Sequence, residues 1–269
     1  MVSELSKQEQ EELSEFRLSF IGDKKEAIHT VQFLDPLFLK TYLQELSLKI
    51  GSPSLKVTAS IFMKRYAFLA VIGLFAMSRW DKRIDLSMKN VWLENASNSF
   101  IWLPAFSLDN PVAVELDSTT ERDEWRKSVI DELFSQHISL LIEQLNKVTK
   151  ISKLILWENI AVYVFWLYET VLSGAGDEER QQMIENDFKF IFTGAGGQLY
   201  GQYNHNPLAR FNHPKKHFVE TNEEIRIRKT CCFSYKLGSS MKRCKTCPCQ
   251  PIDGSCAAGQ GICEVDKNE

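Results

Sequence analysis

The sequence predicts a mainly helical α+β protein, with a helical domain over residues 1–193 that carries a small antiparallel sheet and a cysteine-rich segment over residues 194–269. Three observations support this fold class. Apolar residues recur at helical spacing through most of the chain, a shorter central stretch alternates apolar and polar residues, and every cysteine lies after residue 230. The composition, 44% hydrophobic and 25% charged, is that of an ordinary globular protein.

The first two helices are indicated by their caps. Ser6 and Glu9 have the spacing of a capping box, which predicts a short amphipathic helix after them. Asp35 can cap a second helix, and Pro36 suits its first turn. Gly51 follows the last apolar residue of that pattern and predicts its end.

A third helix is expected to begin after Pro53 and to run to about Ser78. It contains the most apolar run of the chain, Tyr66–Met77, of about a dozen residues, whereas a helix that spans a membrane needs roughly 20. We interpret it as a core helix and expect no membrane span. Residues 1–16 lack the basic start and apolar stretch of a secretory signal, so we expect a cytoplasmic protein.

The central stretch predicts the small sheet. Apolar and polar residues alternate from Arg83, and a second apolar run over residues 100–106 follows the polar residues 95–98. These two runs predict a β-hairpin. Residues 111–116 predict a third strand.

The second half of the helical domain predicts three further helices. A capping-box pattern that begins at Ser118 precedes a long apolar stripe from Val129 to Leu145. Residues 154–172 are apolar on most sides and predict a buried helix, and residues 177–192 predict the last one. Beyond Gly194 the composition shifts to Gly, Asn, Pro and basic residues, and we place the domain boundary there.

The cysteines of the last segment predict a metal centre. The adjacent pair Cys231 and Cys232 is followed, after residues 233–243, by Cys244 and Cys247. Four soft thiolates on two short pieces of chain suit an iron–sulfur cluster or a zinc ion. Seven cysteines, all after residue 230, cannot join the rest of the chain by disulfides. Spacing alone leaves iron–sulfur and zinc both open.

The adjacent pair and the remaining cysteines set two conditions. Neighbouring side chains diverge in an extended strand, so Cys231 and Cys232 can bind one centre only if the chain turns sharply there. Cys249 lies two residues after Cys247, and its sulfur can reach a metal if Pro248 turns inward. We therefore consider Cys249 a possible exchange ligand. We expect Cys256 and Cys263 to be spare thiols.

These residues resemble the C-terminal signature of the FhuF-like ferric-siderophore reductases, a vicinal cysteine pair followed by C-x2-C. Residues 228–232 and Cys247-Pro248 are similar to the residues around that family's cluster, and Leu156–Asn159 resembles its tryptophan-x-asparagine element. The resemblance implies a [2Fe-2S] cluster. The longer gap over residues 233–243 and the extra cysteines depart from the signature. The ligands that the resemblance implies are Cys231, Cys232, Cys244 and Cys247.

The resemblance also implies a reaction, the one-electron reduction of siderophore-bound Fe(III) in the cytoplasm, with hydroxamate or citrate-hydroxamate siderophores favoured. Oxygen donors hold Fe(II) far less strongly than Fe(III), so reduction releases the iron. Gly194–Gly197 lacks the third glycine and the βαβ setting of a dinucleotide site and is interpreted as a helix-ending turn. Electrons are therefore expected from an external donor such as a ferredoxin or a flavin reductase. An iron–sulfur redox sensor or carrier, and a zinc-stapled binding module, are the alternatives.

Basic residues gather around the cysteines. The chain as a whole has a net charge of −3 and no long basic block, which gives no reason to expect a nucleic-acid partner. A local basic surface can attract an anionic ferric chelate, although a solvated loop face is the simpler interpretation. The residues predicted to bind substrate are Lys215, Lys216, Arg226 and Arg228.

Overall fold

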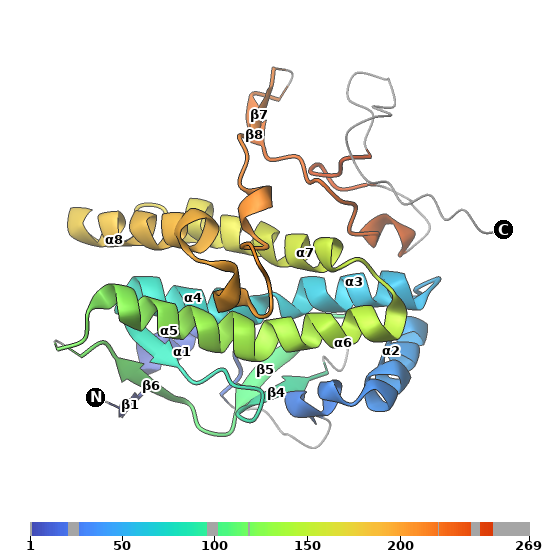
Figure 1. Cartoon of the computed structure of the whole chain (residues 1–269), viewed down its shortest axis with the longest axis horizontal. Coiled ribbons are helices and arrows are strands. Elements are labelled where there is room, and N and C mark those ends of the chain that lie inside the picture. The colour runs from blue at the N-terminus through green and yellow to red at the C-terminus, as the bar shows by residue number, and fades with distance from the viewer. Residues whose placement is uncertain are drawn as a thin grey trace.

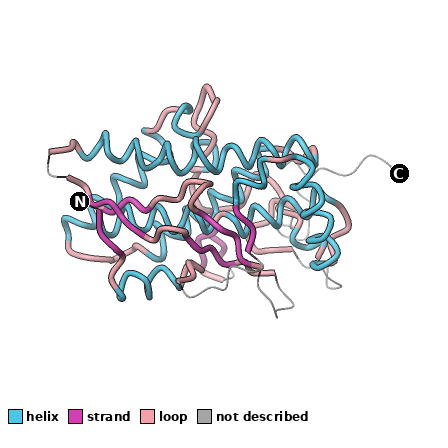
Figure 2. Tube along the Cα trace, turned by 90° about the horizontal axis from the view of Figure 1, so that it is seen from below, coloured by secondary structure: helices cyan, strands magenta, loops and turns pink. Residues whose placement is uncertain are grey.

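The computed structural model describes residues 2–20, 27–95, 102–117, 119–219, 221–237 and 243–249. A bundle of helices forms the body of the molecule, the strands of residues 2–115 lie along one side of it, and the cysteine-bearing segment lies on the opposite side (Figures 1 and 2). This arrangement confirms the mainly helical α+β class. The helices are α1 (Lys7–Ser14), α2 (Pro36–Ile50), α3 (Leu55–Tyr66), α4 (Phe68–Trp80), α5 (Arg122–Leu133), α6 (Ser139–Thr149), α7 (Lys153–Trp166) and α8 (Glu178–Lys189).

The caps that the sequence predicts are present. Both hydrogen bonds of the capping box between Ser6 and Glu9 form at the start of α1. The Asp35 carboxylate accepts the first backbone N–H groups of α2, at 2.7 and 2.8 Å. Gly51 ends α2 at a φ of 62°, a left-handed conformation that glycine adopts without strain. These local signals therefore fix where the first helices begin and end.

The centre of the bundle differs slightly from the prediction. The single helix expected up to Ser78 is two consecutive helices, α3 and α4, which meet at Ala67. By length and composition two helical stretches, Leu55–Trp80 and Lys153–Val171, are apolar enough to cross a membrane, but 89% and 61% of their apolar windows are buried inside the protein. This burial is that of core helices in a globular fold.

The long helix predicted up to Leu145 is interrupted. A π-helical turn, Phe134–Ile138, joins α5 to α6, and similar turns over Leu167–Val171 and Phe190–Gly194 extend α7 and α8. The capping residue predicted at Ser118 lies outside the described residues. The π turn between α5 and α6 places the buried His137 against the centre of the bundle.

The strands of residues 2–115 form two three-stranded antiparallel sheets, and a hairpin spans the predicted turn but has a different first strand from the one predicted. The predicted first strand, β3 (Lys82–Ile84), pairs with β6 (Val112–Glu115), and the strand that pairs with β5 (Ala105–Leu108) is β4 (Val91–Glu94). The cause is a polar turn after β3, in which Asp85 accepts hydrogen bonds from Ser87 and Asn90 and redirects the chain. The sheet orders are β1 (Val2–Glu4), β6 (Val112–Glu115), β3 (Lys82–Ile84) and β2 (Ala27–His29), β4 (Val91–Glu94), β5 (Ala105–Leu108).

Residues after Gly194 continue the same hydrophobic core. Tyr200, Leu208 and Phe211 are fully or almost fully buried and belong to one core cluster with the helices. Gly194–Gly197 ends the π turn, as the interpretation of a helix-ending turn expected. The backbone of the following loop passes so close to Gly197 that a Cβ atom there would lie 2.2 Å from the carbonyl oxygen of Tyr203. Gly197 therefore leaves the space in which the backbone of this loop packs.

Acid is expected to destabilise the protein through His137. Burial lowers the pKa of His137 from 6.5 to about 4, while its ring nitrogens contact the Leu86 carbonyl and the Tyr66 hydroxyl, each at 2.6 Å. The unfolded chain binds the proton more tightly than the folded one. The stabilisation is therefore complete above pH 6.5 and is lost as the pH falls toward 4, by about 3 kcal/mol.

Urea unfolding at pH 7, 5.5 and 4 measures this effect, with His137→Gln as the comparison. Glutamine can still contact both partners but does not titrate. The difference in stability between the two proteins should shrink as the pH falls. A difference that stays constant over this range would contradict the assignment.

Candidate metal centre

Two short pieces of chain carry the cysteines over the ends of α3 and α7 (Figure 1). One contains Cys231 and Cys232 and the other spans residues 243–249. The backbone N–H of Arg228 donates to the carbonyl oxygen of Thr246 at 2.8 Å and joins the pieces. The second piece is itself closed by a turn, in which the N–H of Cys247 donates to the carbonyl of Cys244 at 2.9 Å. The two halves of the motif are thus held side by side.

The chain turns sharply directly after the vicinal pair, as simultaneous binding by both cysteines requires. Phe233 has a φ of 59°, a left-handed conformation that a bulky residue adopts only where its surroundings enforce it. The turn points the Phe233 N–H at the Cys231 sulfur, at 3.4 Å. It also starts the short 3-10 helix Ser234–Lys236. Both cysteines are buried.

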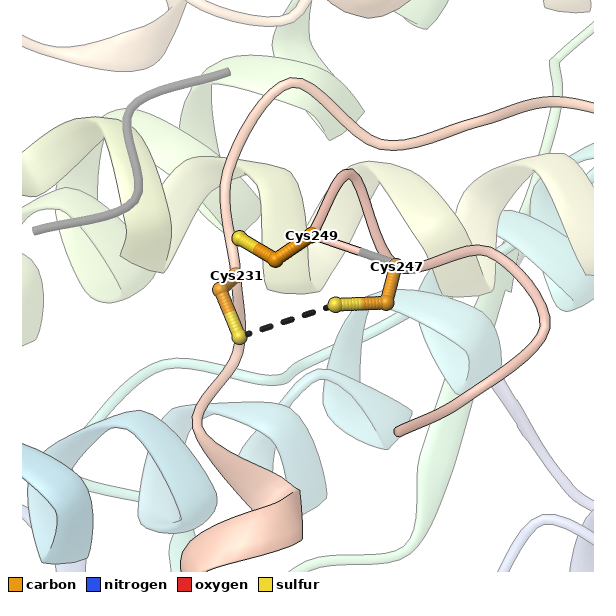
Figure 3. Close-up of side chains that lie close together, drawn as sticks. All are labelled: Cys231, Cys247 and Cys249. Atoms are coloured by element: carbon orange, nitrogen blue, oxygen red, sulfur yellow. Dashed lines mark hydrogen bonds between the residues drawn. The ribbon is translucent and has the colours of Figure 1, made fainter. Parts of the chain in front are cut away.

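Cys231 and Cys247 meet at a distance suited to a metal. Their sulfurs are 3.8 Å apart, and the sulfur of Cys249 lies within 4.8 Å of both (Figure 3). Two metal–sulfur bonds of about 2.3 Å at a tetrahedral angle separate their sulfurs by about 3.8 Å. The donor set and its spacing therefore fit a thiolate-bound metal.

Cys232 and Cys244 form a second pair. The Cys232 sulfur is 3.1 Å from the Ser234 hydroxyl and interacts with the Cys244 thiol. Cys244 is exposed, whereas Cys231, Cys232 and Cys247 are buried. The structure thus divides the four predicted ligands into two pairs, one buried and one that reaches the surface. The two irons of a [2Fe-2S] core take two thiolates each, which matches this division.

The two vicinal thiols differ in their electrostatic environment. A hydrogen bond from the Cys247 thiol lowers the pKa of Cys231 to about 7, helped by the Phe233 N–H and opposed by burial. The hydrogen bond to Cys244, together with burial, raises the pKa of Cys232 to about 12. Of the two vicinal thiols, Cys231 is thus the one that ionises at the lower pH.

Cys249 lies close to the centre, as its predicted role requires, but its sulfur is in a disulfide. A disulfide sulfur does not bind a metal as a thiolate, so Cys249 becomes a ligand only after reduction. Cys256 and Cys263 lie outside the described residues.

Two cations contact the sulfurs. Arg243 extends over the ring of Tyr235 and places Nη1 3.7 Å from the sulfurs of Cys231 and Cys247. Lys64 on α3 places Nζ 3.9 Å from the sulfur of Cys232. Positive charge beside thiolates offsets the negative charge that four of them bring together.

Glu158 on α7 anchors the strand that leads into the vicinal pair. Its buried carboxylate accepts hydrogen bonds from the N–H of Lys229 at 2.5 Å, from the N–H of Thr230 at 2.7 Å and from the Thr230 hydroxyl. Hydrogen bonds to a buried carboxylate are among the strong ones in proteins. Glu158 therefore fixes the backbone one residue before Cys231.

Asn159 connects the same strand to α3. Its amide donates to the carbonyl and hydroxyl oxygens of Ser60, both at 3.0 Å, and its oxygen accepts from Arg228 at 2.7 Å. The Ser60 hydroxyl in turn donates to the carbonyl of Cys232 at 2.9 Å. Sequence reasoning singled out Leu156–Asn159 only by resemblance and missed its role. That role is to hold the cysteine segment.

The residues predicted to bind substrate occupy three different environments. Lys215 and Arg226 both pair with Glu169, each at 2.8 Å. Lys216 is exposed on β7 (Lys216–Phe218), which pairs with β8 (Glu223–Ile225) in a protruding hairpin (Figure 1). Arg228 is buried, and its guanidinium is engaged by Asn159 and Glu158.

A pocket of about 230 Å³ opens between α7 and this hairpin. Its lining includes Phe165, Glu169 and Arg226, and it reaches Thr246, which lies between Cys244 and Cys247. Lys215 and Arg228 also line it. The pocket therefore brings three of the four residues predicted to bind substrate next to the cysteine loop.

Comparison with known families identifies the chain. The sequence profile of one family, "Ferric iron reductase FhuF-like transporter", matches residues 60–211. This match covers more than half of the chain, so the chain belongs to the FhuF-like ferric iron reductase family, as the resemblance predicted. The matched residues include Ser60, Lys64 and Leu156–Asn159 and end before the cysteines. A comparison with curated proteins found no match.

Proposed function

We propose that this protein is a cytoplasmic ferric-siderophore reductase that binds a [2Fe-2S] cluster through Cys231, Cys232, Cys244 and Cys247. Membership of the ferric iron reductase family, together with the 3.8 Å separation of the Cys231 and Cys247 sulfurs, supports the proposal. When bound, the cluster supplies a store for one electron, which converts chelated Fe(III) to Fe(II). The proposed substrates are hydroxamate or citrate-hydroxamate siderophores.

The residues around the cysteines are arranged for this role. Phe233, Arg243 and Lys64 direct donors at the sulfurs, which favours bound thiolates. Glu158 and Asn159 hold the segment against the helical core. The exposed Cys244 marks the edge at which a chelate or a donor can approach.

The proposed docking surface for the chelate is the pocket beside the cysteine loop with the hairpin of β7 and β8 next to it. Lys215, Arg226 and Arg228 line this pocket. Lys215 and Arg226 share Glu169 as their ion-pair partner, Asn159 holds Arg228, and Lys216 is exposed on β7 beside the pocket. The described strands pair only antiparallel, which is not the setting of a dinucleotide fold, and this supports an external donor such as a ferredoxin or flavin reductase.

Anaerobic mixing of the reduced protein with several ferric siderophores tests the proposal. Protein reduced with dithionite and freed of excess reductant should release Fe(II), trapped by a ferrous chelator, in proportion to the electrons it carries. NADH or NADPH with the purified protein alone should release none. Brown protein that is oxidised by no ferric siderophore would point to a sensor or carrier, and colourless protein with stoichiometric zinc to a binding module.

A further inference from the structure

Lys64 contacts the cysteine centre although it lies 168 residues before Cys232 in the sequence. It lies in the last turn of α3, and its ammonium group is 3.2 Å from the Ser234 hydroxyl and 3.9 Å from the Cys232 sulfur. Ser234 contacts the same sulfur at 3.1 Å. The three groups form a compact triangle in which serine holds the ammonium beside the sulfur.

The position of this charge matters for electron transfer. A [2Fe-2S] cluster on four thiolates is negatively charged, and reduction adds one more negative charge. A fixed positive charge beside a ligand sulfur stabilises the reduced form more than the oxidised form, because net charge and hydrogen bonds to the sulfurs set the potential. Arg243 acts on the Cys231 and Cys247 sulfurs, and Cys232 is influenced by the charges of both Arg228 and Lys64, of which Lys64 contacts its sulfur.

Lys64 and Arg243 differ in what holds them. Arg243 belongs to the cysteine segment and moves with it, whereas Lys64 belongs to α3 in the helical core. The distance between Lys64 and Cys232 therefore depends on how the segment is docked. Ser60, on the same helix, fixes that docking through its hydrogen bond to the Cys232 carbonyl.

We propose that Lys64 is a redox-tuning residue whose ammonium group, placed by Ser234, raises the reduction potential of the cluster. The inference rests on the proposed function, because it requires a [2Fe-2S] cluster on these cysteines. The electron would come from the external donor, and the Lys64 ammonium would keep its proton and its charge. Docking of the segment against α3 then helps to set the potential.

Anaerobic spectroelectrochemical titration of Lys64→Gln is the test, since it reads the midpoint potential and not the turnover. Removing the charge should lower the equilibrium constant for reduction about tenfold, which is about 59 mV for one electron. Lys64→Arg should keep most of the potential. Lys56→Gln is the matched control, because Lys56 lies on the same helix, about 12 Å further along its axis.

The possible outcomes separate a failure of the Lys64 inference from a failure of the proposed function. If the parent protein holds no [2Fe-2S] cluster, the proposed function fails. If the parent holds the cluster and Lys64→Gln has the parent's potential, only the tuning role is overturned. An equal fall for Lys56→Gln would also overturn it, because general charge would then suffice. Should Lys64→Gln fold poorly, Lys64→Met, which keeps the apolar stem and removes the charge, should lower the potential in the same direction.

Discussion

Replacing Cys247 by serine is expected to remove the metal centre and to reduce ferric-siderophore reduction by at least about 100-fold. Cys247 is buried, and its sulfur is both the partner of Cys231 at 3.8 Å and a contact of Arg243. Changes around a metal ligand already lower metal affinity 10- to 100-fold, and loss of the ligand exceeds that. Iron and acid-labile sulfide, expected at two each per chain in the parent, measure the loss.

The helical bundle should stay folded in this variant, because most of its buried side chains come from α2 to α8. Circular dichroism and the thermal midpoint therefore accompany the metal analysis. Cys263→Ser is the control and should keep its iron. Loss of iron from Cys263→Ser, or full iron in Cys247→Ser, would mean that the ligands are assigned wrongly.

Replacing Glu158 by glutamine is expected to release the cysteine segment although no ligand is touched. The carboxylate accepts from two backbone N–H groups and one hydroxyl, and the amide of glutamine would present N–H groups to donors. Loss of a buried, fully bonded carboxylate costs about 3 kcal/mol. The variant should bind less iron, and proteases should cleave it after residue 211 faster than the parent.

Glu169→Gln provides the matched control. Glu169 follows Glu158 in the same helical stretch, but it is partly exposed and pairs only with the side chains of Lys215 and Arg226. This variant should keep full iron content and the proteolysis pattern of the parent. If both variants lost iron equally, the anchoring role of Glu158 would be refuted.

Local signals in the sequence predicted the helices well. The capping residues Ser6, Asp35 and Gly51 act through neighbours only a few residues away, so their effect is visible in a short window. Strand pairing is different, because β3 selects β6 through long-range packing that periodicity does not encode. The first strand of the expected hairpin was placed wrongly for that reason.

The candidate site shows the same limit. The turn required at the vicinal cysteines could be predicted, because two adjacent side chains cannot otherwise face one centre, and Phe233 provides it. Glu158, Asn159 and Lys64 could not be predicted as partners of the cysteines. They approach from helices about 70 or more residues earlier in the chain, and nothing in their own surroundings marks them as polar anchors or donors.

The unequal burial of the cysteines also determines which of them an oxidant reaches first. Peroxide and other small oxidants attack accessible thiolates first, and Cys244 is the exposed member of the set. Oxidative damage would therefore start at the pair of Cys232 and Cys244, where its early product, a sulfenic acid, is still reversible. The surface at which we propose that a chelate approaches is thus also the place where oxidation of the cysteines is expected to begin.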